Sequence, residues 1–247
     1  MNRIRVHTIA LSDTHFGLLS GDRIRELIQI LRAEFEFRQL LLVGDIVDSL
    51  PLLAKELEFF SFLSELSESG VKVVWIKGNH DIDFRKETTG AAAFYRIPFC
   101  REYTWTFGGR NYLAIHGHQF DTWVTKNGGW RNKVISRFIW ILQQIDRRQR
   151  LYGLLKCNPH IQRIWKRNIE KVANAAFRYV KKYKKKIGGL RRKKKFKIHV
   201  ILCGHTHHVE EITRNGVTYV NAGSCGEGSL TFVTVDLNGG IQIHHRK

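Results

Sequence analysis

The chain has 247 residues, of which 43% are hydrophobic, so it can bury a sizeable core in one large domain with an insertion or in two smaller ones. No segment approaches the roughly 18 uncharged apolar residues of a membrane span, and the charged start "MNRIRVHTIALSD" lacks the features of a signal peptide. The four cysteines are scattered without a CxxC pair, which argues against a disulfide framework and a thiolate zinc site. These features predict a reduced, cytoplasmic enzyme.

The net charge of +19 is concentrated in one segment. From Lys126 to Lys197 there are 24 Lys and Arg residues and only two acids, whereas the remainder has 17 bases and 20 acids. An almost neutral body therefore carries one very basic insertion. Such an asymmetry predicts an anionic partner for the insertion, which would be a phosphorylated substrate, acidic lipid or nucleic acid.

Outside the insertion, apolar strands alternate with amphipathic helices. Strands are expected at 4–13, 39–45, 71–81, 110–118 and 198–207, and helices at 23–35 and 52–66. Later, Asn215-Gly216 and Asn238-Gly239 predict the turns of two antiparallel hairpins. This order predicts an α/β fold with parallel strands, in which ligands gather beyond the carboxyl ends of the strands.

Polar residues follow five of these strands, in the segments "SDTH", "GDIVD", "GNHD", "HGH" and "GHTH". Alone, a strand-end Asp often caps a helix and an Asn often occupies a turn. Five clusters on one edge of one sheet instead predict a shared site. The neighbouring glycines are expected to let the backbone turn tightly there, at Gly44, Gly78, Gly117 and Gly204.

The side chains of these clusters offer oxygen and imidazole ligands and no thiolate. That set favours Mn²⁺, with Fe or Zn²⁺ as alternatives, over Ca²⁺ or a structural zinc. The groups exceed the needs of one ion with open positions, but they suit two divalent metal ions that share a bridging carboxylate. Two cations roughly 3.5–4 Å apart would clamp a phosphoryl group and acidify a water. The sequence therefore predicts a two-metal hydrolase.

The order D-x-H, G-D-x-x-D, G-N-H-D, H-G and G-H-x-H resembles the calcineurin-like metallophosphoesterases over residues 4–125 and 198–245. The resemblance implies two mixed β-sheets packed as a sandwich and flanked by helices. It implies a catalytic domain at 1–125 and 198–247, and a basic helical insertion or lid at 126–197. It also implies one metal bound by Asp13, His15, Asp45 and His207, and a second bound by bridging Asp45, Asn79, His116 and His205.

His80 is similar to the family's histidine that contacts the phosphate or protonates the leaving group, and Asp48 is expected to orient it. Cleavage of a phosphoester needs a proton donor at the leaving oxygen, and a carboxylate behind the imidazole keeps that donor charged near neutral pH. His80 and Asp48 are therefore the predicted catalytic residues. His208 is expected to be an exposed neighbour, whereas His118 would either contact substrate or support a ligand.

The segments "YVNAGSCGEGSLTFVTVDLNGGIQI", "LLLVGDIVDS" and "IHGHQFD" look most like the branch of UDP-2,3-diacylglucosamine pyrophosphohydrolases, which has a helical insertion at the same place. The chain departs from the best-known enzymes there, which have arginine at His80 and aspartate at His118, and members often have tryptophan at Cys225. The histidine at position 80 makes the chain more similar to general phosphoesterases. The alternatives are a phosphodiesterase or nuclease, a general phosphatase, and a basic module that binds nucleic acid or membrane.

Within the insertion, helices are expected at 134–145 and 161–187. In the second, apolar residues recur at alternating three- and four-residue spacing, with Lys and Arg on the other face. This pattern fits a cap packed on the body, a lid that admits an acyl chain and holds anionic headgroups, or a grip on nucleic-acid phosphates. We favour the lid, because a helix that only grips phosphates needs no continuous apolar stripe. A lid would place the enzyme peripherally on the inner face of the membrane.

Overall fold

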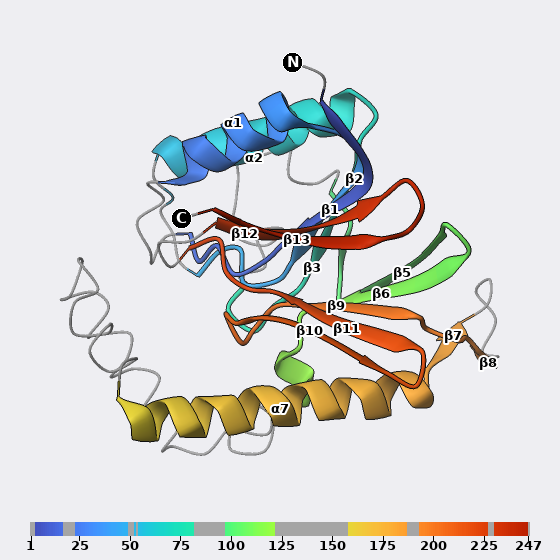
Figure 1. Ribbon diagram of the computed structural model, residues 1–247. Helices are drawn as coiled ribbons and strands as arrows, with labels where there is room; N and C mark the ends of the chain where they lie inside the picture. Colours follow the sequence, from blue (N-terminus) through green and yellow to red (C-terminus); the bar gives the residue numbers. More distant parts are fainter. Residues whose placement is uncertain are drawn as a thin grey trace.

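The computed structural model describes residues 3–16, 23–48, 52, 54–81, 97–121, 158–186, 193–226 and 230–246. Two sheets face each other, with helices on their outer sides (Figure 1). In spatial order, the first contains β13 (Ile241–Arg246), β12 (Leu230–Asp236), β1 (Ile4–Leu11), β2 (Phe35–Val43), β3 (Lys72–Ile76) and β4 (Phe99–Cys100). The second contains β10 (Val209–Arg214), β11 (Val217–Ala222), β9 (Val200–Cys203), β6 (Arg110–Ile115) and β5 (Glu102–Phe107). The predicted α/β sandwich is therefore confirmed.

Parallel strands form the centre of both sheets. In the first, β1, β2 and β3 are parallel neighbours, and in the second β6, β9 and β11 are. The polar clusters thus follow strands of two sheets, so the expectation of one edge of one sheet is wrong. The physical reason is the path of the chain, which leaves the first sheet after β4 and enters the second at β5, with Arg101 between them.

Local sequence explains the elements that frame the site. Helix α1 (Ile24–Glu34) buries Ile24, Leu27, Ile28 and Leu31, which share one helical face. Helix α2 (Ala54–Glu68) ends just before Ser69-Gly70, as expected, where Gly70 adopts φ +88°. Both predicted hairpins are present, β10–β11 and β12–β13. The first turns through Asn215 and Gly216, both with positive φ, as a type I′ turn requires.

Helix α7 (Pro159–Lys181) runs along the outer side of the second sheet (Figure 1). Its apolar stripe from Val172 to Val180, continued by Tyr183, is buried in one cluster with sheet residues such as Ile201 and Tyr219. This half of the stripe is core, so its continuity no longer argues for a lid. The helix also ends earlier than expected, because Lys184–Lys186 form the short strand β7, paired with β8 (Lys193–Lys195).

Two further expectations concern a second helix of the insertion and the absence of a membrane span. The helix predicted at 134–145 lies outside them. Among the residues that the structure describes, no helix combines the length and the apolar character needed to cross a membrane.

Because one face of α7 is buried, substitutions on that face should destabilise the protein more than substitutions on the exposed face. Ala176→Asp should lower the free energy of unfolding by about 3 kcal/mol or more, because it buries an unpaired charge. Lys171→Asp, on the exposed face of the same helix, should change it by only about 0.5 kcal/mol. Urea unfolding of both variants measures the difference. Equal effects would show that the stripe is not core.

Candidate metal centre

Five residues of the polar clusters adopt left-handed backbone conformations. Their φ values lie between 51° and 73°, at Asp13, His15, Asp45, His205 and His207. In the described part of the chain, Asn215 is the only other non-glycine residue with positive φ. Each such conformation costs roughly 1–2 kcal/mol, and strain of this kind concentrates at functional sites. These left-handed conformations turn the side chains of neighbouring loop residues toward a common point.

Two glycines leave room for the candidate ligands. A Cβ atom on Gly78 would collide with the carboxylate of Asp45, and one on Gly204 would collide with Ser12 and Asp13. Neither glycine has a positive φ, so close approach, and not a left-handed backbone, is what requires glycine at these two positions. Gly44 and Gly117 do adopt positive φ, at 85° and 114°.

Asp81 holds two of the loops together, a role that the sequence analysis did not assign. Its buried carboxylate accepts hydrogen bonds at 2.7 to 3.1 Å from the indole of Trp75 and from the backbone N–H groups of Asp45, Ile46, Val47 and Gly78. Five donors fix the loop after β2 against the loop after β3. In the sequence, Asp81 is visible as the carboxylate that ends the motif "GNHD".

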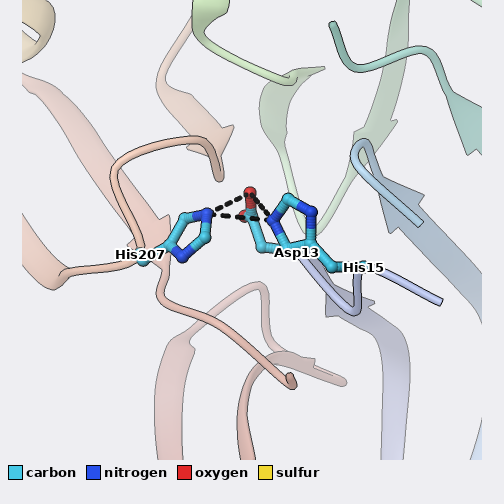
Figure 2. A group of neighbouring side chains, drawn as sticks. All are labelled: Asp13, His15 and His207. Carbon is cyan, nitrogen blue, oxygen red and sulfur yellow. Dashed lines mark hydrogen bonds and ion pairs between the residues drawn. The ribbon is translucent and has the colours of Figure 1, made fainter. Parts of the chain in front are cut away.

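The first group of converging side chains is Asp13, His15 and His207 (Figure 2). Nε2 of His15 lies 3.0 Å from Nε2 of His207, and Oδ1 of Asp13 lies 3.3 Å from the His207 nitrogen and 3.8 Å from the His15 nitrogen. A point about 2 Å from all three atoms lies between them, which is the length of a bond from zinc to nitrogen or oxygen. The group has the size of a metal site.

The second group is Asp45, His116 and His205, whose ligand atoms lie within 4.8 Å of one another. Nε2 of His116 lies 3.5 Å from Oδ2 of Asp45 and 3.4 Å from Oδ1 of Asp13, so it connects the two groups. These two groups contain six of the seven predicted ligands, and a third group consists of His15, Asp48 and His80. The assignment of each ligand to one ion stays a prediction. The bridging role of Asp45 stays a prediction, as does the role of Asn79, which is exposed in the loop after β3.

The electrostatics of the site favour cations. The side chains of Asp13 and Asp45 are 0% and 2% exposed, and no described Lys or Arg forms an ion pair with either. Burial alone would raise the pKa of Asp13, but His207 and His116 hold that pKa well below its usual value. Burial likewise opposes protonation of His116, yet Asp45 and Asp13 raise its pKa. The donor set therefore fits divalent metal ions, and these His and Asp clusters are typical of a dinuclear site.

Asp48 lies between two histidines. Its Oδ1 is 3.0 Å from Nδ1 of His15 and 3.6 Å from Nδ1 of His80. The side chain of His80 is 49% exposed, so it is open to a substrate. Asp48 thus contacts the candidate ligand His15 more closely than the candidate acid that it was expected to orient.

His118 lies against His116, with their Nδ1 atoms 3.1 Å apart. Burial, followed by the charges of His116 and His205, lowers the pKa of His118 to about 4. His118 thus contacts the candidate ligand His116, and the choice between support of that ligand and contact with substrate stays open. His208 is exposed, as expected.

A cleft of about 720 Å³ borders the second group. One wall is the first half of α7, with Trp165, Lys166 and Ile169, and the other is the loop His205–His208. Asp121, which the sequence analysis did not single out, also lines it and lies 3.0 Å from Nε2 of His205. The signal for Asp121 was the carboxylate that closes "IHGHQFD".

Comparisons with known proteins bear on the family and the fold. A model of the family described as calcineurin-like phosphoesterase matches residues 6–209. The fold is similar to that of a novel archaeal phosphodiesterase, at 16% identity, 97% coverage of this chain, 99% of the other and a TM-score of 0.50. Wild-type Vps29 complexed with zinc from Entamoeba histolytica has 13% identity, 97% coverage of both chains and a TM-score of 0.42. No curated protein sequence matches the chain significantly.

The strained loops predict an unusual order of stabilities at His207. His207→Gly should unfold with a free energy about 1 kcal/mol higher than His207→Ala in metal-free buffer, because glycine relieves the left-handed strain. At Val209 in β10, where the backbone is extended, the alanine variant should be the more stable by about 0.5–1 kcal/mol. Chemical unfolding of the four variants tests this, and the same order at both positions would contradict it.

Proposed function

We propose that this chain, which belongs to the calcineurin-like phosphoesterase family, hydrolyses phosphoester or pyrophosphate bonds with the help of two divalent metal ions. The observation that carries the proposal is the pair of adjoining His and Asp groups at the ends of the two sheets. When bound, two cations neutralise charge on a phosphoryl group and lower the pKa of a water molecule. Mn²⁺ is the ion that we propose, with Fe or Zn²⁺ as alternatives.

In this proposal the chain's own residues divide the work. Asp13, His15, Asp45 and His207 hold one ion, and Asp45, Asn79, His116 and His205 hold the other. The buried carboxylates keep the site selective for cations, because an uncompensated buried charge is costly. Asp48 and His118 orient the rings of His15 and His116, with which they form contacts of 3.0 and 3.1 Å.

His80 is the proposed general acid. It combines a side chain that is 49% exposed with a carboxylate, Asp48, 3.6 Å from its Nδ1. A charged imidazole there would donate a proton to the leaving oxygen. Its backbone N–H also donates to Oδ1 of Asp45 at 2.8 Å, which ties the acid to the metal site.

The substrate that we propose first is a nucleotide-linked lipid such as UDP-diacylglucosamine. The support is the cleft beside the site, which is larger than an inorganic phosphate needs and has Trp165 and Ile169 beside Lys166. The buried half of the stripe confines any acyl contact to the first half of α7. A phosphodiesterase, nuclease or general phosphatase is the alternative, and a screen of UDP-linked lipid, phosphodiester, phosphomonoester and single-stranded DNA with Mn²⁺ distinguishes them.

The outer face of α7 supports an anionic partner. Its bases are exposed and form no ion pair with the described carboxylates, at Arg163, Arg167, Lys171, Arg178 and Lys181. We propose an anionic membrane surface as that partner, with nucleic acid as the alternative, and hence a cytoplasmic enzyme peripheral to the inner face of the membrane. Vesicle sedimentation at rising salt tests the membrane arm.

Asp45→Asn should abolish hydrolysis and reduce the bound metal from two ions toward one or none. The amide keeps the shape and one acceptor oxygen but removes the charge that we propose both ions share. Metal content after dialysis and turnover of a simple phosphoester measure the effect. Glu68→Gln, at an exposed carboxylate that ends α2, is the matched control, and near-normal metal content in Asp45→Asn would contradict the two-ion site.

His80→Ala should retain its metal and lose on the order of 10²–10⁴ in rate, which is the usual contribution of a positioned acid. The loss should be smaller for a good leaving group such as nitrophenolate, because that group needs no proton. Rates for a series of leaving groups measure this dependence. An equal loss across the series would remove the general-acid role and leave phosphate binding.

A further inference from the structure

We propose that Asp121 is a positioning residue that sets the orientation and tautomer of His205, and that Asn168 of α7 holds Asp121 in place. Oδ2 of Asp121 lies 3.0 Å from Nε2 of His205 and 3.0 Å from Nδ2 of Asn168. The inference rests on the proposed function, in which His205 binds a metal ion, and it makes α7 part of the support of that ion.

The chemistry of the carboxylate determines which nitrogen of His205 carries the proton. Asp121 is 5% exposed, and an ionised carboxylate only accepts hydrogen bonds. His205 must therefore donate from Nε2, which leaves the lone pair of the neutral ring on Nδ1. Histidines that bind metals commonly donate their second ring N–H to a carboxylate, which fixes the ring and raises its basicity.

The amide of Asn168 has its orientation imposed by the same carboxylate. Its Nδ2 donates to Asp121, and its Oδ1 is buried without a hydrogen-bond partner among the described residues. A buried acceptor without a partner costs about 1–3 kcal/mol. Turning the amide over would place Oδ1 against the carboxylate, so the contact with Asp121 outweighs that cost.

The packing of α7 determines where Asn168 lies. Val172 is one helical turn further along, and it is fully buried in the cluster shared with the second sheet. The core contact of Val172 therefore places Asn168, Asn168 places Asp121, and Asp121 places His205. The chain of contacts joins residues that are 47 and 84 positions apart in the sequence.

Calorimetric titration of the metal-free protein with Mn²⁺ tests the proposal. Asp121→Ala should weaken one of the two Mn²⁺ sites by about 10–100-fold and leave the other unchanged. Asp121→Asn keeps an oxygen that accepts from Nε2 of His205, so it should recover most of the affinity. Asn168→Ala should weaken the same site by a smaller factor, and it carries the test should Asp121→Ala fail to fold.

Two controls separate positioning from a general loss of structure. His160→Ala changes an exposed residue of the same helix outside the cleft and should leave both sites unchanged. In the His205→Ala background, Asp121→Ala should cause no further loss of Mn²⁺ affinity, because a residue that acts through His205 has nothing left to position.

The proposal is overturned if Asp121→Ala binds both ions like the wild type, weakens both sites equally, or adds its full loss to that of His205→Ala. Because no substrate is present, the result is independent of hydrolysis. If the variants show the expected Mn²⁺ affinities but the wild-type protein cleaves no phosphoester, only the proposed function is contradicted. A chain that cleaves phosphoesters with unchanged Mn²⁺ affinity in Asp121→Ala would contradict this inference alone.

Discussion

Two carboxylates almost without solvent, Asp13 and Asp45, impose the main constraint on this structure. They are 0% and 2% exposed at the junction of the two sheets, and the described residues around them supply imidazoles instead of Lys or Arg. A buried charge needs a partner, so protons on His116 and His207 or bound cations must compensate these carboxylates. Protons and cations are then alternatives, and metal binding at this site should release protons.

The backbone around these carboxylates adopts strained conformations that hold this arrangement of side chains. Left-handed turns at five of the clustered residues cost stability, and the structure tolerates them because other contacts determine the loops. The carboxylate of Asp81 binds the two loops that carry Asp45 and His80, and Gly78 lets them approach each other. The strain is concentrated where it turns side chains toward the site, which is the reason to regard it as functional.

The sequence was sufficient for the elements whose signal is local. Short motifs at the strand ends predicted Asp13, Asp45 and His205 as site residues. The resemblance to a known family predicted the sandwich of two sheets. The change of sheet at Arg101 could not be read, because the alternation of Tyr103, Trp105 and Phe107 predicts a strand but not the sheet to which that strand belongs. Asp121 and Asn168 were missed for another reason. Their role is a contact across 47 residues, and the motif that ends at Asp121 shows a carboxylate there but not that it meets Asn168 and His205.

The apolar stripe of α7 shows where periodicity stops being informative. A spacing of three and four residues predicts that one face is covered, but it does not identify what covers it. The structure divides the helix along its length: from Val172 onward the stripe is core, whereas Trp165 and Ile169 line the cleft beside His205. The cleft wall therefore belongs to a helix whose second half is packed in the core of the second sheet. A substrate that contacts Trp165 or Ile169 would therefore meet a helix that already packs on this sheet through Val172 and the residues that follow it.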